Sequence, residues 1–201
     1  MIDGVATGRA VIMVDDDAEN VIVVIPGANA RLAWPDDAPA CATLLTQLEV
    51  PQDVVAAGLR HGLACGATTV LNPAPADAVE ERLLADCSIV VPNEHELAML
   101  GGTSALTSSG VSTIVVTRGA EGATIHEGDR MRSVEAFAVN AVDTTGAGDA
   151  FCGNLAARLA TGATMRDAVA WSCAAGALTA TTAGAVPSLP LADDVVKLLE
   201  R

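Results

Sequence analysis

The residue types best suited to chemistry lie between Asp143 and Phe151, in the run DTTGAGDAF. Gly146 and Gly148 allow a tight turn before an alanine-rich helix, which leaves the first N–H groups of that helix unpaired and able to bind an anion. Asp149 does not favour an anion by charge, but a carboxylate beside a bound phosphate can accept a proton from a nucleophilic hydroxyl. An anion hole that adjoins a general base fits phosphoryl transfer. On these residues alone, the alternative that Asp149 only caps the helix stays open.

Alternating strand and helix patterns surround this run and have to position it. Strand patterns cover 46–51, 67–75, 88–93 and 112–119, and two weaker ones lie within 122–137. Helical patterns cover 52–66, 77–87, 94–102, 147–162, 164–181 and 191–201. The first of these helices is predicted to have one apolar face, made of Val54, Val55, Leu59 and Leu63. The alternation predicts an α/β fold with a mainly parallel sheet flanked by helices.

Two further strand patterns, at 8–14 and 20–27, precede this alternation. They flank the acidic run DDDAE and therefore predict a β-hairpin. Because the hairpin does not belong to the strand–helix alternation, we expect it to form a small lid attached to the main domain.

The composition restricts the classes of partner. The 201 residues suit one domain with at most a small appendage, and their net charge of −14 repels nucleic-acid phosphates and anionic membrane surfaces. The sequence shows no basic patch, no export signal, and no apolar stretch near the ~20 residues of a spanning helix. The five cysteines are odd in number and widely spaced, which favours free thiols over a zinc site or a disulfide framework. We expect a cytoplasmic protein that binds neither nucleic acid nor membranes.

Several runs resemble the motifs of the ribokinase-like carbohydrate kinases. The run from Asp143 to Gly162, DTTGAGDAFCGNLAARLATG, is similar to the family's C-terminal signature. The other matching runs follow the family's order: IVVIPGANARL, QLEVP, LNPAP, VPNEHEL, VVTRGAEG and TTAGAVPSLP. The resemblance implies a ribokinase-like fold with a remnant β-lid and the ATP-dependent phosphorylation of a sugar hydroxyl. Glu49 and the run 27–29 favour D-ribose as the sugar, with ribose 5-phosphate as the product.

The resemblance also assigns catalytic roles. Asp149 would deprotonate the sugar hydroxyl and so touch the substrate, while Gly146, Ala147 and Gly148 would form the anion hole for the transferred phosphoryl group. Glu49 would contact the sugar. The alternative is that Glu49 is a solvent-facing charge at the end of a strand.

Two further motifs are expected to contact ATP. The glycines of the TRGAEG run would admit close backbone approach to the nucleotide, with a plain β-turn as the alternative. Asn93 and Glu96 match an Asn-x-x-Glu element that organises phosphates and Mg²⁺, on which Glu96 would act indirectly. A capping box at a helix N-terminus is the alternative, and both can be true. The nucleotide-binding residues implied in this way are Asn93, Thr117, Arg118, Gly119, Ala120, Glu121, Gly122 and Gly148.

A monovalent-cation site next to the anion hole is also implied, with K⁺ as the expected ion. Because carbonyl ligands tolerate changes of side chain, this site can be carried over despite sequence variation. The residues that match it are Asp143, Thr145, Thr179, Thr182, Gly184 and Ser188. Mg²⁺ and K⁺ are therefore the expected cofactors, and ATP the co-substrate.

Two stretches depart from the family pattern. The motifs start inside the lid, so the resemblance implies that the family's N-terminal third is lacking, with a remnant lid hairpin over 1–30 and a nucleotide-binding α/β core over 31–201. Such a chain would act as a homodimer through the lid, or be an N-terminally truncated, catalytically impaired nucleotide-binding or regulatory protein. Only Thr103 to Val111 separate ELAMLGG from STIVVTRG, where relatives have a full crossover helix. This leaves the connection between those strands open.

Overall fold

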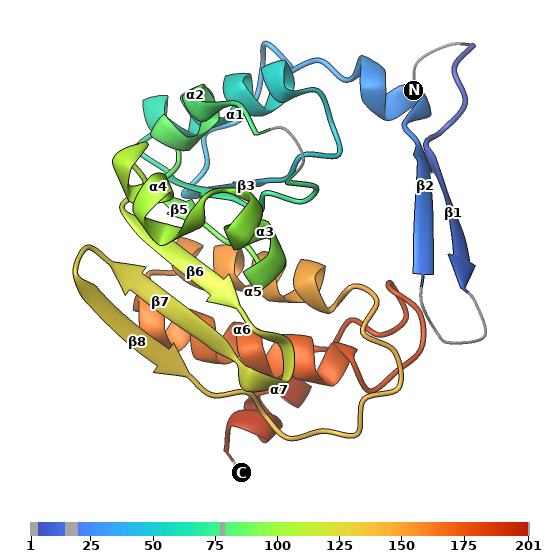
Figure 1. The fold of residues 1–201 in the computed structure, drawn as a ribbon, viewed down its shortest axis with the longest axis vertical. Helices are drawn as coiled ribbons and strands as arrows, with labels where there is room; N and C mark the ends of the chain where they lie inside the picture. Colours follow the sequence, from blue (N-terminus) through green and yellow to red (C-terminus); the bar gives the residue numbers. More distant parts are fainter. Residues whose placement is uncertain (1–3, 15–19, 77–78, 201) are drawn as a thin grey trace.

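The structure is a computed structural model that describes residues 4–14, 20–76 and 79–200. β1 (Arg9–Val14) and β2 (Asn20–Ile25) pair antiparallel, with Arg9 opposite Ile25. They form a two-stranded sheet that stands to one side of the main body in Figure 1. η1 (Gly27–Arg31) follows it. The predicted hairpin is confirmed, and the acidic run between its strands lies outside the described residues.

The main body is built on a six-stranded sheet in the order β3-β4-β5-β6-β7-β8. Its parallel strands are β3 (Thr43–Thr46), β4 (Thr68–Leu71), β5 (Ile89–Val90) and β6 (Thr113–Thr117). An antiparallel hairpin at one edge consists of β7 (Ala123–Glu127) and β8 (Arg130–Val134). The prediction of a mainly parallel sheet is confirmed.

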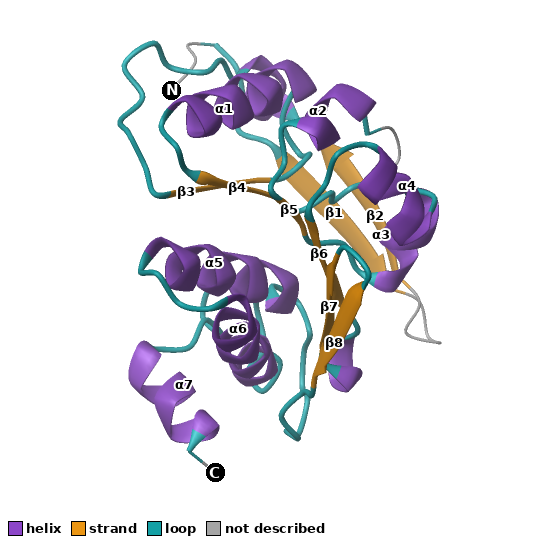
Figure 2. Cartoon of the chain, turned by 90° about the vertical axis from the view of Figure 1, so that its left-hand side faces the viewer, coloured by secondary structure: helices purple, strands orange, loops and turns teal. Residues whose placement is uncertain are grey.

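Helices cover both faces of this sheet, as Figure 2 shows. One face carries α1 (Gln52–Ala64), α2 (Glu81–Ala85), α3 (Glu94–Met99) and α4 (Gly102–Ser108). The other carries α5 (Ala147–Ala160) and α6 (Met165–Thr179), and α7 (Ala192–Leu199) packs against α6. None of the helices in the described ranges combines the length and the apolar character needed to cross a bilayer.

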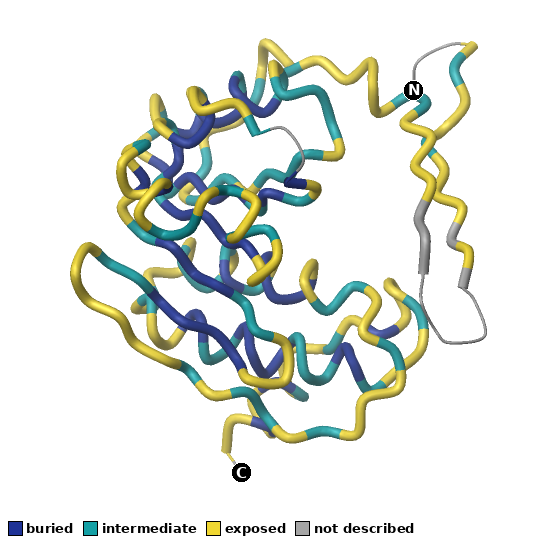
Figure 3. The backbone as a smooth tube through the Cα atoms, in the orientation of Figure 1, coloured by how far each residue is buried: buried dark blue, intermediate teal, exposed yellow. Residues whose placement is uncertain are grey.

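Neighbouring strand residues enter two different hydrophobic layers, because successive side chains of a strand point to opposite faces. Leu71 and Ile114 are buried with the side chains of α1, α2 and α4. Val70 and Val115 are buried with Phe151 and other side chains of α5 and α6. The burial pattern along the chain is visible in Figure 3, where the central strands are dark blue. The continuous apolar runs of these strands are what a sheet covered on both faces requires.

Helix α1 packs through small residues as well as large ones. Its buried residues are Val55, Ala56, Gly58, Leu59 and Gly62. A Cβ at Gly58 would lie 2.7 Å from the Trp34 ring, and one at Gly62 would lie 2.9 Å from Thr69 Cγ2. These glycines let the Trp34 ring and the sheet approach the helix closely. The buried face of α1 is therefore the face that contains Gly58 and Gly62. Leu63 is 46% exposed, so its predicted place on the buried face is wrong.

The strand predicted over 46–51 lies earlier in the chain. β3 ends at Thr46, and the chain bends over residues 48–50. Within this bend the Gln47 side chain accepts a hydrogen bond from the Glu49 N–H. Side chain to backbone bonds of this kind compete with a strand ladder. Glu49 therefore follows the strand instead of lying within it.

Two short helices, α3 and α4, connect β5 to β6. They meet at Gly101, whose left-handed backbone has a φ of 81°. Helix α4 was not predicted from the sequence, and it buries Leu106 against the sheet. Together the two helices supply the crossover that parallel strands need, which resolves the connection that the sequence left open. In the helix predicted over 77–87, residues 77–78 lie outside the described ranges and α2 covers only Glu81–Ala85.

Candidate active site

The predicted site residues gather at one edge of the sheet. Because β3 to β6 are parallel, their carboxyl ends meet at the same edge, which is the usual place for ligands in open α/β sheets. Glu49 follows β3, and Asn93 follows β5. Asn93 also forms an isolated parallel bridge with Thr117, the last residue of β6.

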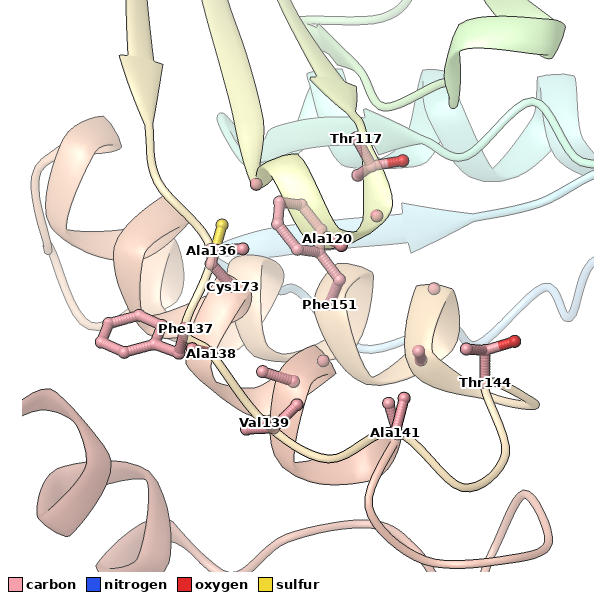
Figure 4. Close-up of a pocket in the computed structure, with 17 residues that line it drawn as sticks. Thr117, Ala120, Ala136, Phe137, Ala138, Val139, Ala141, Thr144, Phe151 and Cys173 are labelled. Carbon is pink, nitrogen blue, oxygen red and sulfur yellow. The ribbon is translucent and has the colours of Figure 1, made fainter.

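A cavity of about 480 Å³ lies next to the end of β6 (Figure 4). Its walls are the end of β6, η2 (Gly119–Glu121), the segment 136–141 and the helices α5 and α6. Of the predicted residues, those that line it are Thr117, Gly119, Ala120, Gly122, Ala147 and Gly148. Asn93, Arg118 and Glu121 do not line it. The structure therefore brings most of the TRGAEG run and part of the predicted anion hole to one cavity.

Arg118 and Glu121 bond to each other across the turn after β6. Arg118 Nη2 lies 3.5 Å from Glu121 Oε2 and donates to the Glu121 carbonyl at 3.3 Å. The Arg118 N–H donates to the Gly122 carbonyl at 2.8 Å. A turn is therefore present, as the plain alternative predicted. The Arg118 Nε is buried and has no hydrogen-bond partner among the described residues.

Position 122 requires glycine because other backbone atoms of the chain lie too close for a side chain. Its φ is 88°, and an added Cβ would lie 2.1 Å from the Val134 carbonyl oxygen and 2.6 Å from the Ala136 nitrogen. Glycine at this position lets the turn after β6 lie directly against the chain that leaves β8. The close approach that the structure shows at this motif joins two segments of the chain at the wall of the cavity, and the approach to a nucleotide stays a prediction.

Sequence reasoning assigned no role to the rest of the cavity wall. Its other residues are Ala136, Phe137, Ala138, Val139, Ala141, Thr144, Phe151, Cys173, Gly176, Ala177 and Ala180. Most of these are small and apolar, so they would contact a ligand through surface area and no spacing rule marks them. Phe151 is the exception, because it belongs to the signature run that contains Asp149.

The N-terminus of α5 presents unpaired donors beside this cavity. Gly146 is the N-cap, with a φ of 80°, and no side chain caps the helix. The Ala147 N–H donates to the Thr144 carbonyl at 3.1 Å, whereas the N–H groups of Gly146, Gly148 and Asp149 have no partner among the described residues. Asp149 lies in the first turn and is exposed, so it does not cap the helix. Gly146 and Gly148 thus offer free donors, and the Ala147 donor is used internally.

Asn93 and Glu96 form a reciprocal capping box at the start of α3. The Glu96 N–H donates to Asn93 Oδ1, and the Asn93 N–H donates to Glu96 Oε2, both at 2.8 Å. Burial raises the pKa of the Glu96 carboxyl, against the opposing effects of the Asn93 N–H and the His95 charge. Burial, and then the charges of Asp149 and Glu96, raise the pKa of the Cys152 thiol to about 12.

Asp143 joins the segment before α5 to the loop 181–188. Its Oδ1 accepts the Thr145 N–H at 2.9 Å, and its Oδ2 accepts the Gly184 N–H at 2.8 Å. The N–H groups of Val142 and Asp143 both donate to the Ala180 carbonyl, at 2.7 and 3.2 Å. The Gly184 N–H, followed by the hydroxyl and N–H of Thr145, lowers the pKa of Asp143 from 3.8 to about 2. The carboxylate is therefore ionised and holds the two loops together.

The residues predicted to hold K⁺ fall on these two segments, except Thr179, which is the last residue of α6. The buried hydroxyls of Thr179 and Ser188 donate to carbonyls of their own segments, at 3.0 and 2.8 Å. The carbonyl oxygens that accept no hydrogen bond from the described residues include those of Asp143, Thr145, Thr182, Gly184 and Ser188. Such carbonyl oxygens are the ligands that K⁺ takes in place of its hydration shell, so the donor set fits the ion. The described residues contain no cluster of three or more histidine, cysteine or carboxylate side chains suited to a metal.

Glu49 lines a second cavity of about 800 Å³, beside the lid hairpin. The other residues of its wall are Val24, Pro26, Ala30, Leu48, Val50, Pro51, Ala74 and Pro75. Glu49 is exposed and, among the described residues of this wall, is the only one whose side chain carries polar atoms. The predicted sugar contact therefore lies in a different cavity from the predicted nucleotide contacts.

Comparison with known proteins decides the family. The sequence pattern described as "pfkB family carbohydrate kinase" matches residues 1–192. The chain belongs to this family. The ribokinase of Staphylococcus aureus (strain COL) is 35% identical over 208 residues, which cover 94% of this chain and 68% of that protein. The ribokinase of Haemophilus influenzae is 32% identical over 212 residues, which cover 96% of this chain and 69% of that protein.

Solved structures of this family share the fold. The ribokinase of Thermotoga maritima has a TM-score of 0.88 and 30% identity, and the match covers 98% of this chain and 71% of that chain. The ribokinase of Arabidopsis thaliana complexed with ribose and ATP has a TM-score of 0.86 and 27% identity, over 98% of this chain and 70% of that chain. These matches confirm the resemblance, the ribokinase-like fold and the enzyme class. The protein is a phosphotransferase that acts on carbohydrates.

Proposed function

We propose that this pfkB-family protein transfers the γ-phosphoryl group of ATP to the primary hydroxyl of D-ribose, giving ribose 5-phosphate and ADP. One observation carries the proposal. The free N–H groups of Gly146 and Gly148 and the exposed carboxylate of Asp149 stand together at the start of α5, where Gly148 lines the 480 Å³ cavity. The Arabidopsis thaliana ribokinase of the same fold is complexed with ribose and ATP, which supports this pair of substrates.

Asp149 would act as the general base. Its carboxylate accepts the proton of the ribose hydroxyl while the hydroxyl oxygen attacks the γ-phosphorus. The bond from the γ-phosphorus to the oxygen that bridges the β- and γ-phosphates breaks, and ADP leaves with the electron pair. The N–H groups of Gly146 and Gly148 stabilise the charge on the transferred group, and Ala147 holds the turn between them.

Each substrate would bind in its own cavity. The nucleotide would occupy the cavity that ends at Gly148, against the turn after β6, with Asn93, Arg118 and Glu121 acting from its margin. The buried Nε of Arg118, which lacks a partner among the described residues, is a donor suited to a phosphate oxygen. The sugar would lie in the second cavity, where Glu49 accepts hydrogen bonds from its hydroxyls.

Mg²⁺ and K⁺ are the proposed ions. Glu96 keeps one carboxylate oxygen free of protein hydrogen bonds among the described residues, and it would act on Mg²⁺ through water. The carbonyl-rich segments around Asp143 and Gly184 would hold K⁺. Bound there, these ions supply positive charge to the phosphates and fix the conformation of the loop before α5.

We also propose a lid hairpin over 1–30, a nucleotide-binding core over 31–201, and a homodimer that forms through the lid. The hairpin exposes apolar side chains, among them Val11, Val23 and Ile25. Burying such side chains against a second copy would stabilise a symmetric dimer. Sedimentation equilibrium tests this, with Val11→Asp expected to give monomers and Met131→Asp, on exposed β8, to leave the dimer intact. A monomeric parent protein contradicts the proposal.

A second candidate function is nucleotide binding, with or without a regulatory role, and with little sugar turnover. It is favoured by the wall of the second cavity, where Glu49 alone of the residues that the structure describes carries polar side-chain atoms. Ribose presents several hydroxyl groups, and a specific site has to pair most of them. A protein of this second kind would bind ATP without ribose-dependent release of ADP.

ADP release separates the two candidates. The purified protein is assayed with ATP, Mg²⁺ and K⁺, with and without D-ribose, and its unfolding temperature is measured with and without ATP. Release of ADP that depends on ribose supports the kinase. A rise in unfolding temperature with ATP but no ribose-dependent release supports the second candidate. No response to ATP in either assay contradicts both.

A further inference from the structure

The wall of the 480 Å³ cavity is poor in polar side chains. Apart from the two threonines, Thr117 and Thr144, and the thiol of Cys173, every residue that lines it has a hydrocarbon side chain or none. Figure 4 shows this composition, since the only oxygen atoms on its sticks belong to the threonines and the only sulfur to Cys173. In the part of the chain that the structure describes, no charged side chain lines the cavity.

The two threonines stand where a nucleobase would not reach them. Thr144 lies two residues before the N-cap Gly146, and its carbonyl accepts the Ala147 N–H at 3.1 Å. Figure 4 shows it at the opposite end of the cavity from Phe137. The Thr117 hydroxyl lies 3.5 Å from the Pro92 carbonyl, to which it donates at the strand end. If the phosphates bind at the N-terminus of α5 as proposed, the base would lie toward Phe137 and Cys173.

The groups left to form hydrogen bonds with the base are the Cys173 thiol and the backbone. Burial raises the pKa of the Cys173 thiol to about 11, so it stays a neutral and weak hydrogen-bond donor at neutral pH. The N–H and C=O groups of residues 136–141 form no hydrogen bonds with the described residues. A free backbone segment offers donors and acceptors side by side. It can therefore pair with either the amino group of adenine or the carbonyl oxygen of guanine.

We infer that this cavity selects its nucleobase by shape and backbone bonding, so that the enzyme accepts inosine and guanosine triphosphates as phosphoryl donors alongside ATP. The inference rests on the proposed binding of nucleotide in this cavity. A site with a polar side chain aimed at the base rejects the wrong base by about 10⁴–10⁵-fold, whereas a hydrophobic pocket discriminates between similar ligands by only about 10–200-fold. The composition of this wall places the enzyme in the second class.

Donor kinetics test the inference. With saturating D-ribose, Mg²⁺ and K⁺, kcat/KM is measured for ATP, ITP and GTP. The expected values for ITP and GTP lie within about 200-fold of the value for ATP, and larger losses for both overturn the inference.

A binding assay without turnover distinguishes a failure of this inference from a failure of the proposed kinase activity. The unfolding temperature is recorded with non-hydrolysable analogues of ATP and GTP. Similar rises with both analogues support the inference even if no sugar is phosphorylated. A rise with the adenosine analogue alone overturns the inference but not nucleotide binding. No rise with either analogue overturns both.

Two buried cysteines offer a matched pair of variants. Cys173 lines the cavity, whereas Cys152, equally buried, does not. Cys173→Ala and Cys152→Ala are both expected to leave the ratio of kcat/KM for GTP and ATP within about threefold of the parent value, because neither thiol sets the choice of base. A change of about tenfold or more in Cys173→Ala alone shows that the thiol reads the base, and overturns the inference.

Discussion

Replacing Gly148 and Gly146 by alanine, one at a time, tests the mouth of α5 with two changes of the same size. Gly146 has a φ of 80°, and an added Cβ would lie 3.2 Å from Ala185 Cα. Gly148 has no such left-handed backbone, and nothing lies within 4 Å of an added Cβ. The first variant therefore strains the fold, whereas the second adds a methyl group only to open space at the cavity wall.

We expect the two substitutions to change the stability of the fold in opposite directions. Left-handed backbone and crowding at Gly146→Ala cost about 2 kcal/mol, which lowers the unfolding temperature by about 4–8 °C in a chain of this length. Gly148→Ala lies within α5, where alanine is preferred over glycine by about 0.5–1 kcal/mol, so its unfolding temperature rises by about 1–4 °C. Its methyl group would nevertheless stand where the phosphoryl group is proposed to bind. A displacement of about 1 Å there lowers kcat/KM by about 10²-fold.

Thermal unfolding and ribose-dependent ADP release are measured on both variants and on the parent protein. Gly148→Ala is expected to be as stable as the parent or more stable, yet to lose most of its activity. If Gly148→Ala keeps full activity, the N-terminus of α5 does not bind the phosphoryl group. If it is destabilised as much as Gly146→Ala, the packing described at this helix mouth is wrong.

Three further changes test the surrounding structure. Gly122→Ala forces a Cβ to 2.1 Å from the Val134 carbonyl oxygen, and we expect a loss of about 3 kcal/mol or more in the free energy of unfolding, measured in urea; an unchanged value contradicts the geometry. Asp143, whose pKa is lowered to about 2, stabilises the fold above its ordinary pKa of 3.8 and loses this effect as the pH falls through about 2. The parent should therefore be more stable than Asp143→Asn at pH 7, with a difference that shrinks between about pH 4 and pH 2 in thermal melts. Asn154→Ala removes the 2.9 Å bond from Trp171 Nε1 and should cost about 1–3 kcal/mol in the same urea assay, without changing the KM for ATP.

The strands and long helices could be predicted because their hydrophobic periodicity is local. Buried runs such as 113–117 and the alanine-rich run 147–160 carry their structure in neighbouring residues. Helix α4 was missed because Gly101 and Gly102 read as a chain break, although their left-handed backbone only redirects the chain. The place of β3 was wrong because a side chain to backbone bond at Gln47 ended the strand, and period-two patterns do not record such bonds.

The motifs identified one wall of the 480 Å³ cavity because glycine is needed there for geometric reasons, as at Gly122. The opposite wall, from Phe137 to Ala141 and on α6, consists of residues that any hydrophobic segment contains. The bond from the Gly184 N–H to Asp143 joins residues 41 positions apart, and only the folded chain reveals it. The capping box at Asn93 was readable from sequence, since both of its partners lie three residues apart.

The most direct test of the account is the replacement of one carboxylate. Asp149→Asn keeps the size of the side chain in the first turn of α5 but removes the proposed base. Asp193→Asn makes the same change in the first turn of α7, away from both cavities. We predict that Asp149→Asn lowers kcat for ribose-dependent ADP release by about 10²–10⁴-fold and leaves the rise in unfolding temperature with ATP unchanged, whereas Asp193→Asn behaves as the parent. Turnover by Asp149→Asn at the parent rate would contradict the assignment of Asp149 as the base.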